Sequence, residues 1–367
     1  MLFLFLIVLF LYVLLIVRYI IGWYKIGSTR KESFSPNVSV VIAIRNEENE
    51  IARLLRNLGA QIYPVGKLEF IFINDHSSDN TVQLLEACTL DNFRIINMPD
   101  GKAGKKSAIS MGVSLASGEI ILASDADCYF NVNWVRCMTK YFTDDNIKLV
   151  SGPVDFNRYN SFFQKLQALE FLSLIGSGAG AIGIQNAIFC NGANMAYRKE
   201  TFIEVNSFKD DTIVSGDDVF LLHNIKAKYP ESIAFAKDRD AIVTTNSPIT
   251  FKEFINQRKR WAAKSSAYKD ASSIYTSHLV LWTNFSFVFL LGMFFFDDTL
   301  LFYFLIFYVL KFSVDLFLLY PVLNFFNRKE LIKWIFPFEL FYSIYIILIV
   351  ILSFSTKFEW KGREYKK

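Results

Sequence analysis

Residues 119–128 read EIILASDADC, and this stretch decides how the chain folds. Its first half is a short, continuous apolar run, which is typical of a strand buried on both faces of a parallel sheet. Asp125 and Asp127 come directly after this run. The stretch therefore predicts a buried strand that ends in two closely spaced carboxylates.

The residues before this strand alternate between strand and helix patterns. Three further strands are predicted at 37–45, 67–75 and 92–99, and helices at 46–61, 80–89 and 104–117. This alternation predicts an α/β, Rossmann-like domain with a mostly parallel sheet and right-handed crossovers. Ligands bind beyond the carboxyl ends of the strands in such sheets. The polar clusters RNEE, NDHSSDN and DADC should therefore converge on one crevice.

Four long apolar runs lie outside this domain. Residues 1–17 and 279–296 contain no charged side chain, and the runs at 299–323 and 334–354 have few interruptions. Because a bilayer core needs about 20 apolar residues in a helix, we expect one N-terminal and three C-terminal transmembrane helices. The first run has no basic residue before it and no small-residue cleavage site after it, so we expect a retained anchor rather than a signal peptide.

Basic residues predict how the chain is oriented in the membrane. Arg18, Lys25, Arg30 and Lys31 follow the first run, and cytoplasmic flanks are usually basic. We therefore expect an integral, multi-pass protein of a bacterial inner membrane with residues 24–275 in the cytoplasm. Three C-terminal crossings would place the basic tail outside, so either this bias is overridden or one segment does not cross.

The patterns divide the chain into five parts. These are an anchor (1–23), an α/β domain (36–250), interfacial amphipathic helices (251–277), a membrane region of about three helices (278–355) and a basic tail (356–367). The four cysteines show no CxxC spacing, so neither a zinc site nor a disulfide framework is expected. The net charge of +4 is modest. We expect no nucleic-acid partner, because lipid head groups explain the basic membrane flanks.

The polar strand ends offer ligands for a metal ion and a nucleotide. Asp125 and Asp127 can both face a divalent cation, and Mg or Mn prefers such hard oxygen ligands. The alternative for a bare Asp-x-Asp is a pair of solvated turn residues. Asp75 ends the second predicted strand and can accept a hydrogen bond from a base N–H or cap the next helix. Lys105 opens a predicted helix, where it could meet a phosphate or face solvent.

Two more carboxylates stand side by side in VSGDDVFLL (214–222). Asp217 and Asp218 repel each other at a helix start, so one pKa should rise, which suits a general base working near neutrality. The alternative is a simple interaction with the helix dipole. The sequence contains no visible Ser-His-Asp arrangement, so we do not expect covalent acyl chemistry.

The stretch NQRKRWAAK (256–264) places charges and an indole ahead of an apolar run. On a helix, Gln257, Arg260 and Trp261 fall at i, i+3 and i+4, so they share one face, which we expect to look into the crevice. The other basic residues are expected to point toward water or lipid head groups: Arg258, Lys259 and Lys264. The alternative is an ordinary membrane-interface belt of Trp and Arg.

Together these motifs resemble the family 2 inverting glycosyltransferases of the GT-A fold, especially their membrane-embedded members. VVIAIRNEE resembles an opening strand that usually reads P-x-x-N-E, with Ala43 at the proline position. NDHSSDNT resembles D-D-G-S-x-D, and SDADC matches the D-x-D metal motif. GDDVFL resembles E-D-x-x-L, with Asp217 in place of glutamate, and QRKRW matches Q-x-x-R-W. The resemblance runs from about Ser39 to Trp261.

The resemblance implies a role for each residue of the donor site. Asp75 would contact uracil, and backbone near Ala43 and Glu47 would help to hold the nucleoside. Asp125 would lie nearer the ribose, and Asp127 would lie nearer a divalent metal ion, Mg or Mn. The implied donor is a nucleotide-diphosphate sugar, with uridine diphosphate favoured.

The resemblance also implies the chemistry. The metal would neutralise charge on the departing diphosphate. Asp218 would remove a proton from an acceptor hydroxyl, which attacks the anomeric carbon from the opposite face and inverts it. Arg260 would meet the diphosphate, and Trp261 would stack on the acceptor sugar.

Three functions stay open at this point. The first is a transferase that adds one or a few sugars to a lipid or glycan acceptor at the bilayer. The second is a processive polysaccharide synthase, for which about four membrane segments are few unless an oligomer or export partner completes a pore. The third is an inactive membrane scaffold.

The third and fourth apolar runs contain charged residues. Lys311 and Asp315 lie four residues apart and could pair on one helix face, and a charged pair at bilayer depth is a candidate functional feature, as is Glu339. The alternative is that the run with Lys311 is a shorter or interfacial helix.

Overall fold

Seven strands form the central sheet of the computed structural model, in the order β3-β2-β1-β4-β7-β5-β8. Their bounds are β1 Val38–Ile44, β2 Leu68–Asn74, β3 Phe93–Asn97, β4 Ile120–Asp125, β5 Leu149–Ser151, β7 Met195–Arg198 and β8 Ile233–Phe235. Only β7 runs antiparallel to its neighbours, β4 and β5, among the strands described in this sheet. The prediction of an α/β fold with a mostly parallel sheet is confirmed. The structure describes residues 2–27, 34–88, 90–157, 159–205, 216–265, 267–353, 357–360 and 363–366.

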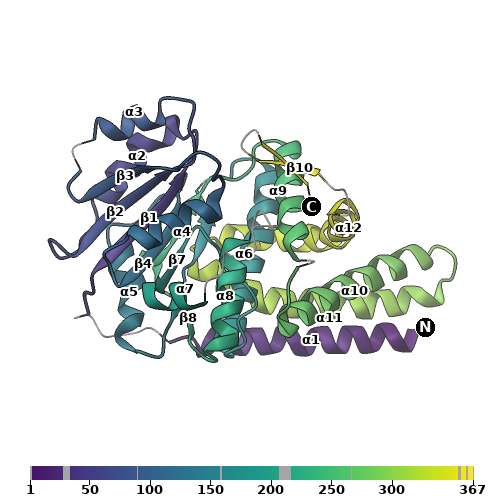
Figure 1. Ribbon diagram of the computed structural model, residues 1–367. Helices are drawn as coiled ribbons and strands as arrows, with labels where there is room; N and C mark the ends of the chain where they lie inside the picture. Colours follow the sequence, from purple (N-terminus) through teal and green to yellow (C-terminus); the bar gives the residue numbers. More distant parts are fainter. Residues whose placement is uncertain are drawn as a thin grey trace.

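Short helices and a small second sheet complete this domain (Figure 1). The helices are α2 Glu48–Gly59, α3 Thr81–Glu86, α4 Lys105–Leu115, α5 Trp134–Thr139, α7 Lys199–Val205 and α8 Asp217–Lys228. The small sheet pairs β6 (Val154–Phe156) with β9 (Val243–Thr245). Short 3-10 turns occur at η1 Lys140–Thr143, η2 Arg239–Ala241 and η3 Lys329–Trp334. Helix α2 buries Ile51, Leu54 and Leu58, which fall at i, i+3 and i+7 on one face of the helix.

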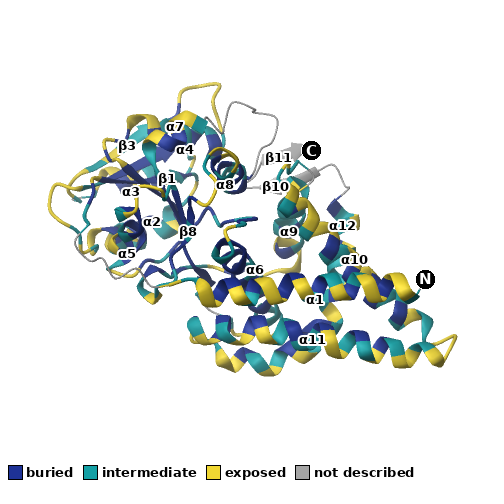
Figure 2. Ribbon diagram, turned by 90° about the horizontal axis from the view of Figure 1, so that it is seen from below, coloured by how far each residue is buried: buried dark blue, intermediate teal, exposed yellow. Residues whose placement is uncertain are grey.

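Six longer helices lie beside and below the sheet in Figure 1. They are α1 Leu2–Lys25, α6 Phe162–Gly183, α9 Phe251–Ser265, α10 Ala271–Met293, α11 Thr299–Phe325 and α12 Ile335–Ser353. Five segments of the described chain are long and apolar enough to cross a membrane: Leu2–Lys25, Phe162–Gly183, Ala271–Met293, Thr299–Phe325 and Lys329–Ser353. The additional one is α6, which is mostly buried between the sheet and α1. Figure 2 shows exposed turns along α1 and α11, where side chains such as Phe10 and Phe317 are apolar and exposed.

Helices α1 and α6 cross with their backbones in contact. A Cβ at Gly22 would lie 1.9 Å from the Gly180 oxygen, and one at Gly183 would lie 2.0 Å from the Gly22 oxygen. No larger residue fits such a crossing, and small residues allow this close approach between apolar helices. The glycine-rich stretch 176–183 is therefore a packing surface that joins the N-terminal helix to the sheet domain.

Buried charges join three of the long helices. The Lys311 ammonium lies 2.9 Å from Asp315 and 2.5 Å from Glu339. The Tyr12 hydroxyl donates to Asp315 at 2.7 Å. The Lys311–Asp315 pair predicted within α11 is present, and it also holds α12 and α1.

The chain ends in a short hairpin beside α9. Strands β10 (Lys357–Trp360) and β11 (Arg363–Lys366) pair antiparallel, and β10 lies next to α9 (Figure 1). Arg30 and Lys31, which contributed to the predicted orientation, lie outside the described residues, as do the side chains of the basic tail.

Candidate active site

A cavity of about 500 Å³ opens at the carboxyl ends of β1, β2 and β4. The parallel register sets Ala43 of β1 opposite Asp125 of β4, and Ile44 opposite Asn74 of β2, so these strand ends are level. Every residue that the sequence analysis assigned to the donor, base or acceptor site lines this cavity: Ala43, Glu47, Asp75, Lys105, Asp125, Asp127, Asp217, Asp218, Gln257, Arg260 and Trp261. They come from the ends of three strands (β1, β2 and β4) and from three helices (α4, α8 and α9) that are far apart in the sequence.

The ends of β1 and β2 contribute to the cavity lining and are joined by hydrogen bonds. Asp75 is buried, and its carboxylate accepts a hydrogen bond from the Gly104 N–H at 3.0 Å. The Arg45 guanidinium donates to the carbonyl oxygens of Asp75 and His76 at 2.7 and 3.1 Å. Asn46 and His76 have φ values of 52° and 55°, a region that non-glycine residues seldom occupy. Such backbone strain clusters at functional sites.

The end of β4 presents Asp125 and Asp127 in different surroundings. The Lys105 ammonium lies 2.5 Å from Asp125 and 3.9 Å from Asp217. Although burial acts in the opposite direction, Asp125 and Asp217 raise the pKa of Lys105, which keeps it protonated. Asp127 accepts a hydrogen bond from the Thr245 hydroxyl at 3.0 Å. These two carboxylates fit a hard divalent cation, which takes oxygen ligands and keeps room for substrate phosphates.

The two adjacent acids at the start of α8 differ in their surroundings. Gly216 precedes them with φ +94°, and a Cβ there would lie 2.8 Å from the Phe220 ring, so this entry to the helix requires glycine. Asp218 accepts from the Gly192 N–H at 3.1 Å and lies 3.2 Å from the Lys264 ammonium. The whole arrangement fixes Asp218 at the cavity wall.

One pKa of the pair is raised, as the adjacent carboxylates predicted, and it is that of Asp217 rather than that of Asp218, the implied base. Burial raises the pKa of Asp217 against the lowering effect of Lys105, and the charge of Asp218 adds to this rise. Burial acts in the same direction on Asp218, but Lys264 and Lys105 hold its pKa below its usual value. Asp218 is therefore the more acidic of the two carboxylates.

Helix α9 brings the Q-x-x-R-W residues to the cavity. Two predictions about neighbouring residues on this helix were wrong. Gln257, Arg260 and Trp261 line the cavity together. Arg258 was expected to face water or head groups, but it is 3% exposed, because its guanidinium pairs with a buried carboxylate of α6. Lys264 was also expected to point outward, but it lines the cavity and pairs with Asp218.

A second cavity, of about 420 Å³, lies between α1, α6, α9, α10, α11 and α12. Most of its lining is apolar, with side chains such as Leu15, Ile175 and Ile346. It shares five lining residues with the first cavity: Phe171, Asn191, Asp218, Trp261 and Lys264. An apolar space among membrane-type helices therefore meets the polar site at Asp218.

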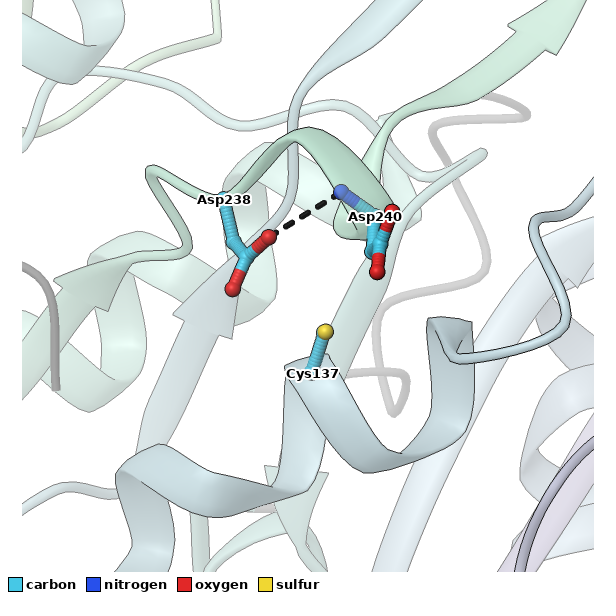
Figure 3. Close-up of side chains that lie close together, drawn as sticks. All are labelled: Cys137, Asp238 and Asp240. Carbon is cyan, nitrogen blue, oxygen red and sulfur yellow. Dashed lines mark hydrogen bonds between the residues drawn. The ribbon is translucent and has the colours of Figure 1, made fainter. Parts of the chain in front are cut away.

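A further acidic group lies outside both cavities and is drawn in Figure 3. Cys137 of α5 faces Asp238 and Asp240, and their candidate ligand atoms lie within 4.8 Å of one another. Lys140 pairs with Asp238 at 2.5 Å, the same separation as between Lys105 and Asp125, so this contact does not distinguish the two acidic groups. Burial, together with the charge of Asp238, raises the pKa of the Cys137 thiol to about 12. A protonated thiol is a poor ligand, because metal ions bind the thiolate, so this group fits a metal less well than Asp125 and Asp127.

Three contributors to the site were missed in the sequence. Arg45 lies inside the opening motif, but its backbone contacts depend on the neighbouring strand. Lys264 follows Gln257 and Trp261 at i+7 and i+3, so helical periodicity could have placed it on the same face. The apolar cavity depends on how six remote helices pack, and only the fold reveals it.

Comparison with known proteins connects this geometry to a family. Residues 39–205 match the family described as Glycosyl transferase family 2. The chain is 26% identical over 214 residues to glycosyltransferase AglE of Haloferax volcanii, which covers 55% of this chain and 65% of that protein. It is 28% identical over 184 residues to the poly-beta-1,6-N-acetyl-D-glucosamine synthase of Staphylococcus aureus, covering 48% of this chain and 43% of that protein. The chain thus matches less than two thirds of the length of these curated relatives.

A solved structure shares the whole architecture. The mannosyltransferase PcManGT from Pyrobaculum calidifontis, in complex with GDP-Man and Mn2+, has a TM-score of 0.63 with 16% sequence identity, and 96% of each chain is covered. At this identity the likeness concerns the fold. Together with the family match and the level strand ends, it identifies residues 39–205 as part of a glycosyltransferase family 2 domain with the GT-A fold, which this chain joins to several long apolar helices.

Proposed function

We propose that this protein transfers a sugar from a nucleoside diphosphate donor to a lipid acceptor held in the membrane. The observation that carries the proposal is the position of Asp218, where the polar cavity meets the apolar cavity. A donor in the first cavity and a lipid in the second would meet at this carboxylate. The apolar cavity favours a lipid over a soluble glycan as the acceptor.

The donor would lie across the ends of β1, β2 and β4. Asp75 would accept a hydrogen bond from the nucleobase. The backbone near Ala43 and Glu47 would lie beside the nucleoside. A uridine diphosphate sugar is the first donor to test. A guanosine diphosphate sugar is the second, since the similarly folded PcManGT was solved with GDP-Man.

The diphosphate would lie among Asp127, Lys105 and Arg260, which line the same cavity. Asp127 and Asp125 would hold a divalent cation, Mg or Mn, and the Mn2+ of PcManGT supports this assignment. The cation would supply positive charge against the departing diphosphate. Lys105 and Arg260 would bind the same oxygens and stabilise the charge that develops there.

Asp218 would act as the general base. It is held by the Gly192 N–H at 3.1 Å, so its carboxylate has a fixed position at the junction of the cavities. It would take the proton of the acceptor hydroxyl as that oxygen attacks the anomeric carbon. Attack from the face opposite the diphosphate would invert the configuration in a single displacement, and Trp261 would support the acceptor by stacking.

The membrane arrangement supports a catalytic domain on the cytoplasmic side. The N-terminal end of α1 and the α10–α11 turn lie together at the end of the helices remote from the sheet (Figure 1). Arg18 and Lys25 lie toward the opposite, domain-facing end of α1, where positive charge favours the cytoplasm. Because β10 lies beside α9, the tail would return to the catalytic side. One of the three C-terminal segments would then not complete a crossing.

A processive polysaccharide synthase is the second candidate, and the Staphylococcus aureus relative favours it. Product size separates the two candidates. A ladder of long glycans would contradict addition of one or a few sugars, whereas a lipid carrying a single added hexose mass would support it.

The decisive experiment is a screen of labelled UDP- and GDP-sugars on membranes that contain the full-length chain, followed by mass analysis of the lipid product. Asp218→Asn should abolish transfer while the protein remains folded and still binds the donor. Equal transfer by wild type and this variant would refute the base assignment. Absence of transfer by the wild type with every donor would favour the inactive scaffold.

A further inference from the structure

The wall between the two cavities contains a buried ion pair that the proposed reaction does not use. Arg258 of α9 is 3% exposed and Glu170 of α6 is 5% exposed. The Arg258 Nη2 lies 2.7 Å from Glu170 Oε2, and its Nε donates to both carboxylate oxygens at 3.0 and 3.1 Å. Burying two charges is costly even when they pair, so such a pair is weak evidence for a stabilising role. Its contacts point to a different role.

Arg258 touches both ends of the Q-x-x-R-W motif. Its Nη1 donates to the Gln257 side-chain oxygen. Its guanidinium carbon lies 4.4 Å from the ring centre of Trp261, and a guanidinium is attracted to an indole face at this distance. Glu170 fixes the plane of the Arg258 guanidinium through three hydrogen bonds. Because the Trp261 indole packs against that plane, Glu170 also affects where the indole lies. The Phe171 ring also stacks on Trp261, with the two ring centres 6.1 Å apart.

Helix α12 reaches the same ion pair. The Tyr345 hydroxyl donates to Glu170 Oε1 at 2.9 Å, and its ring lies 5.5 Å from Phe254, which packs 4.5 Å from the guanidinium carbon of Arg258. Glu170, Arg258 and Tyr345 all line the apolar cavity. A helix at the end of the chain therefore completes the hydrogen bonds of a pair that supports the motif.

We propose that Glu170 and Arg258 are positioning residues for the acceptor. The pair holds Gln257 and Trp261 in the wall between the two cavities, and Tyr345 makes that position depend on the packing of α12. The inference rests on the proposed function, in which Trp261 supports the acceptor. A purely structural pair would affect the amount of folded protein, whereas a positioning pair affects use of the acceptor by protein that is folded.

The test uses full-length variants reconstituted in phosphatidylcholine vesicles, with the sugar nucleotide that the wild type uses. Total lipid extract from membranes in which the wild type is active is the acceptor probe, and it is diluted stepwise to obtain its apparent KM. Glu170→Gln should lower the melting temperature, because the Arg258 charge stays buried without its partner. It should also raise the acceptor KM at least tenfold, with the donor KM within twofold of wild type.

The double variant Glu170→Gln/Arg258→Gln separates the two roles. With both charges removed, the melting temperature should recover toward the wild-type value. The acceptor KM should stay raised at least tenfold, because the guanidinium over Trp261 is gone. Arg258→Lys keeps the charge without the planar fork and should give an intermediate KM, and Tyr345→Phe should raise the KM a few fold.

Asp155→Asn is the matched control. Asp155 is buried and pairs with Arg328 at 2.8 Å, and it is a described residue outside the lining of both cavities. It should lower the melting temperature while leaving the acceptor KM within twofold. Recovery of both melting temperature and acceptor KM in the double variant would show that the ion pair is structural. A wild type that transfers no sugar would instead overturn the proposed function, and this inference with it.

Discussion

The chain contains two Asp-x-Asp sequences, Asp125-Ala126-Asp127 and Asp238-Arg239-Asp240, and the fold treats them differently. The first follows a buried parallel strand and lines the 500 Å³ cavity. The second lies at the short turn η2, where Asp238 precedes the turn and pairs with Lys140, and Asp240 lies within it and accepts from the Asn133 side chain at 2.9 Å. Equal spacing therefore does not give equal surroundings. The position of the pair at a strand end, open to a shared cavity, makes the difference.

Removing one carboxylate from each pair should give the largest difference in activity between the two pairs. Asp127→Asn should lower kcat by about 10³-fold, because the divalent cation that would offset the charge on the departing diphosphate loses a carboxylate ligand. Asp238→Asn should leave kcat within twofold. Initial rates of sugar transfer at saturating donor measure both effects. Similar losses in the two variants would mean that the first pair has no special role.

Metal binding tests the same contrast without turnover. Mn2+ added with the nucleoside diphosphate should raise the melting temperature, and at 100 times its Kd a ligand stabilises the folded state by about 2.7 kcal/mol. The shift should persist in Asp238→Asn and disappear in Asp127→Asn, and EDTA should reverse it. If the melting-temperature shift disappeared in Asp238→Asn and persisted in Asp127→Asn, the metal would instead bind at the group formed by Cys137, Asp238 and Asp240.

The adjacent acids at the start of α8, Asp217 and Asp218, also differ in their surroundings, and the pH dependence of activity tests this difference. Burial acts to raise the pKa of Asp218, but Lys264 and Lys105 hold it below its usual value. The base must be ionised to work, so activity should fall only when acidic pH approaches that lowered pKa. Lys264→Ala should raise the pKa and move the acid limb of the kcat/KM profile to higher pH, with a loss on the order of tenfold at its acid end. An unchanged profile would exclude Asp218 as the titrating group.

The smallest expected effect concerns the stability supplied by the second pair. Although burial opposes it, Lys140 lowers the pKa of Asp238. Its contribution is therefore present at neutral pH and is lost as the pH falls through the folded-state pKa. Asp238→Asn should cost less than about 1 kcal/mol, because the pair is partly exposed. Melting temperatures of wild type and variant should differ slightly at pH 7 and converge in acid.

Much of the donor site was predictable because its signals are local. An apolar run of strand length predicts a buried strand, and parallel strands align their carboxyl ends, so Ala43, Asp75 and Asp125 were expected to meet. The structure brings them to one cavity with Asp217, Asp218 and the α9 motif. Their chemical roles stay predictions until the variants above are measured.

The tertiary structure alone decided which charges face inward. Helical spacing assigns Arg258 to a face, but only the carboxylate of Glu170, 88 residues earlier, makes burial of that face tolerable. In the same way, Glu339 joined Lys311 and Asp315 because α12 packs beside α11. The sequence by itself determined β1 to β4, four of the five membrane-length apolar segments and the acids at the strand ends, since these follow from neighbouring residues. The apolar cavity and the buried ion pairs depend on contacts between remote segments, which local patterns do not specify.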